Sequence, residues 1–130
     1  MKENANKNII KWLHIAIGSD NMIIAELSIV PIGTETSVSK YVKVAIRALE
    51  GRGVRVIPGP MSTILECKDI DLLFKAVKIA HRAVLSAGAA RVITTLKIDE
   101  RTDKDATVES KMRAIMGSSM PADLMRARVE

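Results

Sequence analysis

Two carboxylates on separate predicted strands, Glu26 and Glu66, are the side chains of this chain whose type best suits chemistry. A pair of carboxylates can act as general acid and general base. Such a pair usually works with further groups, and the chain supplies no Ser/His/Asp or Cys/His set, since His81 falls within a predicted helix. We therefore expect a protein that is not an enzyme. The alternative for both carboxylates is structural, as partners of basic residues across a sheet or at a subunit contact. The candidate basic partners are Arg55, Arg91 and Lys97.

Other chemical motifs are weak or missing from the sequence. The single cysteine, Cys67, excludes an internal disulfide and a multi-cysteine metal site, and we interpret it as a small buried side chain rather than a reactive thiol. The sequence contains no glycine-rich phosphate loop, no zinc spacing and no dinucleotide fingerprint. We expect no cofactor and no metal. The cysteine usage fits a reducing compartment, so we predict a cytoplasmic protein.

Composition indicates one globular domain with an aliphatic core. Hydrophobic residues make up 48% of the 130, and aromatic residues only 2%, so few side chains could stack on nucleic-acid bases. The net charge of +5 is spread along the chain, with Lys and Arg interleaved with Asp and Glu as on solvated surfaces. The apolar run at Ile9–Ile17 is too short and too polar to span a membrane. We expect neither nucleic acid nor membrane as a partner.

The elements that must position the candidate residues are built around one strand, within the stretch Met22–Thr34. Alternation at period two gives this strand one wholly apolar face and one mixed face, on which aliphatic side chains stand beside a carboxylate and a hydroxyl. A mixed face of this kind suits a subunit contact or a ligand better than bulk water. The apolar face holds Ile23, Ala25, Leu27 and Ile29, and the mixed face holds Ile24, Glu26, Ser28 and Val30.

The remaining elements follow in the order β-α-β-β-α-β. A hydroxyl-rich loop at residues 34–37 is expected to cap a helix that runs to about Glu50, and Asp69 to cap a second helix that Gly88 ends. This order is the signature of a ferredoxin-like α+β fold, with a four-stranded antiparallel sheet in the order 4-1-3-2 and two helices on one face. Further strands are predicted at Val54–Ile57, Met61–Cys67 and Arg91–Ile98, and a third amphipathic helix at residues 105–116.

The predicted domain covers residues 22–116, with a mobile extension at 1–21 and a loose tail at 117–130. Because the first strand is central in this fold, Glu26 and Ser28 lie on the open face of the sheet, between the third and fourth strands. Aliphatic side chains on this face predict self-association through the sheet, as a dimer or a tetramer. They are Ile24, Val30, Ile64 and Ile93.

Four separated segments carry a resemblance to a known family. They are ELSIVPIGT (Glu26–Thr34), SKYV (Ser39–Val42), PMSTILE (Pro60–Glu66) and RVITTLKIDER (Arg91–Arg101). Together they resemble the small thiamine-binding protein family, over Met22 to about Met116, although the family often has glycine where this chain has Ser62. Members of that family are ferredoxin-like and associate through their sheets. The resemblance implies non-catalytic binding of thiamine or of its hydroxymethylpyrimidine half.

A ligand of this kind fits the polar side chains available. An aminopyrimidine has an amino group and ring nitrogens that a carboxylate and hydroxyls can bind, and the positive thiazolium favours a carboxylate. We expect Glu66 to accept from the amino group or to face the cation, and Met61 to form an adaptable apolar wall. For Thr34 the alternative is helix capping, and for Thr63 a position in the core. The candidate ligand-binding residues are Ser28, Thr34, Met61, Ser62, Thr63 and Glu66.

Three other functions are compatible with this topology. An RNA-recognition domain would present stacking aromatic residues on its central strands, and none occurs on the first or third strand here. An acylphosphatase-like enzyme would need an arginine in the loop after the first strand, and the loop PIGTETS has no basic residue. A regulatory or structural assembly module without a small-molecule ligand stays open, because an oligomer-forming sheet also explains the mixed face.

Overall fold

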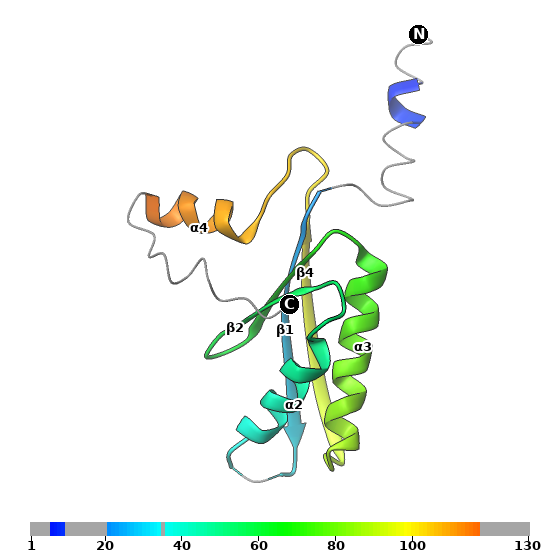
Figure 1. Cartoon of the computed structure of the whole chain (residues 1–130), viewed down its shortest axis with the longest axis vertical. Helices are drawn as coiled ribbons and strands as arrows, with labels where there is room; N and C mark the ends of the chain where they lie inside the picture. Colours follow the sequence, from blue (N-terminus) through cyan, green and yellow to red (C-terminus); the bar gives the residue numbers. More distant parts are fainter. Residues whose placement is uncertain (1–5, 10–20, 35, 118–130) are drawn as a thin grey trace.

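The computed structural model describes residues 6–9, 21–34 and 36–117 (Figure 1). The predictions for the extension at 1–21 and the tail at 117–130 fall almost wholly outside these ranges. From Ile23 to Met116 the order of strands and helices is the predicted one. The elements are β1 (Ile23–Ile32), α2 (Ser39–Leu49), β2 (Arg55–Pro58), β3 (Thr63–Cys67), α3 (Ile70–Ser86), β4 (Arg91–Glu100) and α4 (Val108–Met116).

The four strands form one antiparallel sheet in the order β2-β3-β1-β4, which confirms the predicted arrangement. The central strand β1 pairs with β4 along its whole length, but it pairs with β3 only from Ile23 to Leu27. The strand β3 begins at Thr63, opposite Leu27, and not at Met61 as predicted. The second half of β1 therefore has a strand neighbour on one side only.

The core lies between the sheet and the layer formed by α2 and α3 (Figure 1). It is aliphatic, and burying one large side chain of this type contributes roughly 1.5–3 kcal/mol. Cys67 belongs to this core, and burial raises the pKa of its thiol, so the sulfur is a neutral packing atom rather than a nucleophile at neutral pH. The largest fully buried side chains are Ile23, Leu49, Leu65, Leu73, Val56 and Val84.

The predicted helix caps are correct for α3 and wrong for α2. The Asp69 carboxylate accepts a hydrogen bond from the Asp71 backbone N–H at 2.8 Å and so caps α3. The N-cap of α2 is Val38, which has no hydrogen-bonding group on its side chain, because the helix begins after the hydroxyl run at 34–37. A side-chain cap is worth about 1 kcal/mol. The N-terminus of α2 therefore forms without stabilisation from a side-chain cap.

Helix α4 begins at Val108, three residues later than predicted, behind a capping box formed by Thr107 and Ser110. None of its residues is buried, and the Ile115 side chain is 79% exposed. The helix stands apart from the α2–α3 layer, and its C-terminal end lies away from the sheet (Figure 1). Of its apolar stripe, Val108, Met112 and Met116 are half-buried, and Ile115 is the exposed member.

Candidate functional site

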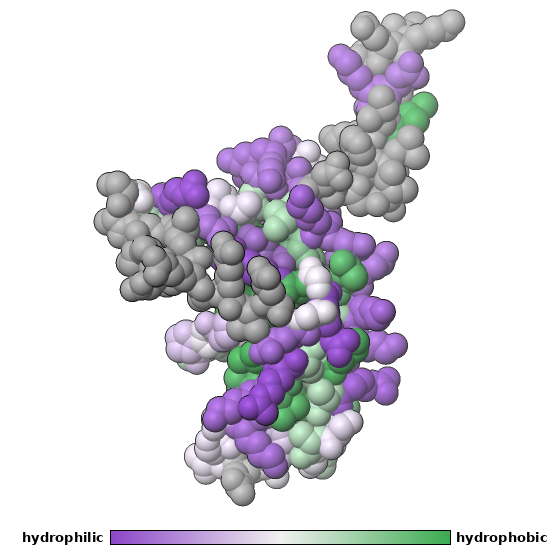
Figure 2. Space-filling model, in the orientation of Figure 1, coloured by the Kyte–Doolittle hydropathy of each residue, from purple (hydrophilic) through white to green (hydrophobic). Residues whose placement is uncertain are grey.

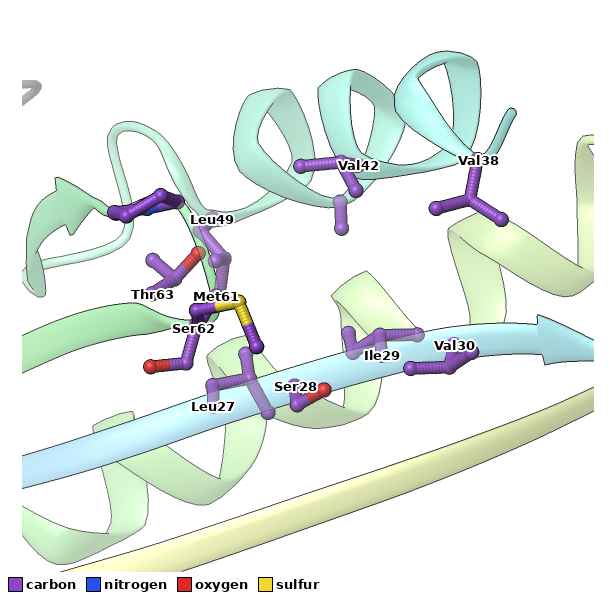
Figure 3. A pocket seen from close by; sticks show the side chains of 13 residues that line it. Leu27, Ser28, Ile29, Val30, Val38, Val42, Leu49, Met61, Ser62 and Thr63 are labelled. Atoms are coloured by element: carbon purple, nitrogen blue, oxygen red, sulfur yellow. The ribbon is translucent and has the colours of Figure 1, made fainter. Parts of the chain in front are cut away.

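A hollow of about 180 Å³ opens between α2, the second half of β1 and the loop that leads from β2 to β3 (Figure 3). It exists because β3 ends its pairing with β1 at Leu27, so that the loop at residues 59–62 borders β1 where a strand would otherwise lie. The loop is tight at Gly59, where an added Cβ would lie 2.7 Å from the Ser62 carbonyl oxygen. Because no strand pairs with the second half of β1 on this side, a concave site is left there.

The walls of the hollow are mainly apolar, and its polar groups lie near the loop. Figure 3 shows Val42 and Leu49 of α2, and the N-cap residue Val38, above β1, with Met61 and its neighbours beside them. Met61 is 90% exposed and Val42 is 37% exposed, so both lie at the rim. Figure 2 shows hydrophobic residues reaching the surface in the region around α2. The apolar wall residues from β1 are Leu27, Ile29 and Val30, and the hydroxyl-bearing residues are Ser28, Ser62 and Thr63.

Four of the six predicted ligand-binding residues line this hollow, namely Ser28, Met61, Ser62 and Thr63. Thr34 does not, because it lies past the end of β1 and lines a second, more polar hollow with Ser37, Lys40 and Tyr41. Glu66 lines neither hollow. The structure therefore brings together the residues of the β2–β3 loop and the middle of β1, and it separates them from Thr34 and Glu66.

Glu66 is 4% exposed and is held by contacts within the chain. One carboxylate oxygen, Oε1, lies 3.3 Å from Nη1 of Arg55, the residue opposite it on β2. The other, Oε2, accepts a hydrogen bond from the Val108 backbone N–H at 2.7 Å. Arg55 Nη1 in turn lies 2.5 Å from Glu109 Oε1. The structural alternative for Glu66, an ion pair with Arg55 across the sheet, is the one that the structure shows.

These contacts attach the start of α4 to one end of the open face. Glu66 and Asp99 flank Ile24 in one row across the sheet, since both are register partners of Ile24. Val108 binds Glu66, and Lys111 forms an ion pair with Asp99. The first turns of α4 therefore cross this row. The sequence pattern placed Glu66 on the open face correctly, but it gave no signal that a later helix would cover it.

The hollow contains no ionisable side chain among the described residues that line it. An apolar cleft with a few hydroxyls fits a flat, uncharged ring with hydrogen-bonding atoms on one edge. His81 is occupied elsewhere, with Nδ1 2.6 Å from the Thr94 hydroxyl between α3 and β4. Within the described ranges no group of three or more His, Cys, Asp or Glu could hold a metal ion.

No helix in the described part of the chain is both long enough and apolar enough to cross a membrane. Sequence reasoning did not include Val38 and Val42 among the site residues, because their helical spacing is that of an ordinary apolar stripe. The signal that could have found these two residues is their place at the start of the helix. That part of the helix lies beside the half of β1 that β3 does not reach.

Comparison with known proteins gives consistent matches to one set of relatives. A family model described as "Thiamine-binding protein" matches residues 25–116. A UPF0045 protein of Methanothermobacter thermautotrophicus is 50% identical over 95 residues, which are 72% of this chain and 96% of that protein. The UPF0045 protein YqgV of Bacillus subtilis is 40% identical over 99 residues, with 72% of this chain and 94% of that protein covered.

Solved structures of similar proteins confirm the fold. The hypothetical protein MJ1052 of Methanocaldococcus jannaschii is similar with a TM-score of 0.69 at 44% identity, covering 77% of this chain and 99% of that chain. A Thermotoga maritima protein, whose name proposes a role in thiamine biosynthesis or salvage, has a TM-score of 0.63 at 21% identity, covering 72% and 98%. At 21% identity, the similarity to the Thermotoga maritima protein concerns the fold alone.

Proposed function

Because the chain belongs to the thiamine-binding protein family, we propose that the hollow between α2 and β1 binds thiamine or its hydroxymethylpyrimidine half without catalysing a reaction. The observation that carries this proposal is the position of the hollow. It lies within the segment that the family model matches, and four residues chosen for ligand binding from the sequence line it.

The size and polarity of the hollow favour the pyrimidine ring as the buried half. Sites for drug-sized ligands have volumes from roughly 300 Å³, and about 180 Å³ is enough for one small ring. Hydroxyls can donate to ring nitrogens and accept from the exocyclic amino group, which suits Ser28, Ser62 and Thr63. The thiazolium of thiamine would then lie at the rim near Met61, where water solvates its charge.

Titration calorimetry with thiamine, hydroxymethylpyrimidine and the isolated thiazole tests this proposal. We expect the first two ligands to bind and the thiazole alone not to bind, because the pyrimidine is the half that enters the hollow. No heat of binding with any of the three would contradict the proposal. A module that only assembles, without a small-molecule ligand, would then be the better description of this chain.

The change Thr63→Val should weaken the binding of hydroxymethylpyrimidine about ten-fold, because it removes one hydrogen-bonding group worth about 1.4 kcal/mol and keeps the shape of the side chain. Thr63 is half-buried in the wall of the hollow. The matched control is Thr102→Val on an exposed loop, for which calorimetry should give the wild-type affinity. Equal affinities for both variants would remove the Thr63 hydroxyl from the site.

We also propose that the open face of the sheet takes part in self-association. Val30 and Ile93 lie opposite each other on this face with 41% and 46% of their surface exposed. Ile64 lies on the same face two rows away, opposite Glu26 on β1. The contacts of Val108 and Lys111 tie helix α4 to the row at the other end of this face. An apolar patch on an otherwise polar face is typical of a contact between subunits.

A charge at the centre of this face should dissociate the assembly without unfolding the chain. We expect Ile64→Lys to shift sedimentation toward a smaller species, because a lysine between two stacked sheets would lose its water. Circular dichroism should keep its helical signal, since the core lies on the other side of the sheet. The control is Ser86→Lys, at an exposed position of α3, which should leave the sedimentation coefficient unchanged. An unchanged sedimentation coefficient for Ile64→Lys would refute this contact.

A further inference from the structure

We infer that the outer surface of the α2–α3 layer binds the phosphate backbone of double-stranded DNA, independently of base sequence. Lys and Arg are interleaved with acidic residues along the chain, and on that basis the sequence predicted no nucleic-acid partner. The fold separates these charges in space. Residues 38–52 and 68–87, which contain α2 and α3, hold eight Lys or Arg and three Asp or Glu, whereas the described residues 21–34, 53–67 and 88–117 hold seven of each kind. The positive charge of the described domain is therefore concentrated on the helix layer.

Six of these cations form two rows with the same spacing, i, i+3 and i+7, which places each row on one face of its helix. In both helices this face is opposite the buried stripe, to which Leu49 of α2 and Leu73 of α3 belong. All six cations are exposed, and Figure 2 shows hydrophilic side chains along the outer side of α3. The rows are Lys40, Lys43 and Arg47 in α2 and Lys75, Lys78 and Arg82 in α3.

The two rows run side by side. Helices α2 and α3 contact each other, and the turn after α2 lies beside the start of α3, since a Cβ added at Gly53 would lie 3.2 Å from Leu72 Cδ1. The two helices therefore run in opposite directions, as Figure 1 shows. Axes of packed helices are about 8–10 Å apart, and a row from i to i+7 is about 10 Å long. The six cations thus form one patch that measures about 10 Å in each direction.

No carboxylate of the two helices interrupts this patch. The segments 39–49 and 72–86 contain neither Asp nor Glu, and the ion pairs described for the chain involve other cations, namely Arg55, Arg101 and Lys111. The acidic residues of the layer lie together where α2 ends and α3 begins. They are Glu50, Asp69 and Asp71. The charge of the patch is therefore available to an anionic partner.

A cationic patch without an apolar centre fits a chain of phosphates better than another protein or a membrane. Protein–protein interfaces have few charged residues at their centre, whereas interfaces with DNA are strongly positive. The exposed apolar side chains of α3, Leu72 and Phe74, lie at one end of its row and offer little area for insertion into a membrane surface. Single strands are bound by stacking of bases on aromatic side chains, which neither row contains. The patch therefore favours the backbone of a duplex.

The separation of the rows favours DNA over RNA. The minor groove of B-form DNA is about 6 Å wide, so two rows about 8–10 Å apart can contact the phosphates on both of its sides. The minor groove of duplex RNA is wide and shallow, and the same rows would reach only one side of it. Contacts to phosphates carry no sequence information. We therefore expect similar affinity for duplexes of any sequence.

Fluorescence anisotropy of the full chain with a labelled DNA duplex of about 20 base pairs, or two helical turns, tests this inference. We expect a dissociation constant of about 1–100 µM near physiological salt, which is typical of sequence-independent binding. The slope of log K against log salt concentration is about −0.9 for each phosphate neutralised, so six contacts predict a slope of about −5. A slope weaker than about −2 would contradict the use of both rows.

Single substitutions locate the contact. Lys43→Gln and Lys78→Gln each remove one cation from one row and keep a good helix former. Each should weaken DNA binding about five- to ten-fold at about 0.1 M salt and reduce the slope by about one. The matched control is Lys104→Gln, which removes the same charge from an exposed loop outside the layer and should bind DNA like the wild type. Equal losses in all three variants would show that only net charge matters and would overturn the inference.

Three further probes distinguish the alternative partners: duplex RNA of the same sequence, vesicles that contain phosphatidylglycerol, and polyglutamate. We expect each of them to bind more weakly than the DNA duplex. RNA binding as tight as DNA binding would contradict the fit to the narrow groove. Binding of vesicles or of polyglutamate without binding of DNA would assign the patch to a membrane or to an acidic protein, and would overturn the inference. Neither Lys43 nor Lys78 lines the ligand hollow, so these outcomes are independent of whether the hollow binds thiamine.

Discussion

Replacing Val42 with phenylalanine should raise the dissociation constant for hydroxymethylpyrimidine and for thiamine at least about a hundred-fold, a loss of about 2.7 kcal/mol. Val42 projects from α2 into the hollow and is 37% exposed at its rim (Figure 3). A larger side chain there can extend into the open volume of about 180 Å³, which is the volume that the ring of the ligand would occupy. The variant should fold normally, because the added atoms enter a cavity and not the packed core.

The control for this variant lies one residue further along the helix. Lys43→Phe adds an aromatic ring of the same size at an exposed position that does not line the hollow. Calorimetry should give the wild-type affinity for Lys43→Phe and no measurable binding for Val42→Phe, while the thermal midpoints of both stay near that of the wild type. If Val42→Phe bound the ligand as tightly as Lys43→Phe, the ligand site would lie elsewhere on the molecule.

The layers of the fold could be predicted because periodicity alone decides which face of each element is buried. Along β1 the apolar face predicted from alternation is the buried one, from Ile23 to Ile29. The ferredoxin-like order then followed from chain connectivity, and the register of β1 with β3 and β4 confirmed it. If the pairing register of β1 were shifted by one residue, its whole apolar face would be exposed. The alternation of apolar and polar residues therefore constrains the register strongly.

The hollow could not be predicted in the same way, because it depends on where a strand is absent. Val38 and Val42 have the helical spacing of core residues, and that spacing does not show whether a strand or a gap faces them. The gap follows from the two-residue delay in the start of β3, at Thr63. Strand ends are set by loop geometry, here the close approach of Gly59 to Ser62, which local sequence reports poorly.

The position of Glu66 illustrates a second limit. Its place on the open face was predictable from alternation with Ile64, but its role depends on the Val108 backbone N–H, 42 residues later in the chain. Helix α4 has no buried residue of its own, so its amphipathic pattern could not show where it docks. The polar contacts that fix it involve single residues and leave no periodic signal.

Removing the Glu66 carboxylate should therefore destabilise the fold and leave ligand affinity unchanged. Glu66→Ala would leave Arg55 in a largely buried place, where Nε and Nη2 already have no hydrogen-bond partner, and would free the Val108 N–H. Breaking one side of a buried ion pair costs about 3–5 kcal/mol. We expect a loss near the lower end, because Glu109 still contacts Arg55. Urea unfolding should show it as a lower midpoint with an unchanged slope.

A double variant identifies the cause of that loss. Replacing both charges with apolar side chains, Arg55→Met with Glu66→Leu, removes the uncompensated charge and should recover much of the stability lost in Glu66→Ala. The recovery should be incomplete, since the Val108 N–H still lacks its acceptor. If the double variant were as unstable as Glu66→Ala, the attachment of α4 and not the buried arginine would account for the cost. A weaker affinity for hydroxymethylpyrimidine in Glu66→Ala, with the fold intact, would instead return Glu66 to the ligand site.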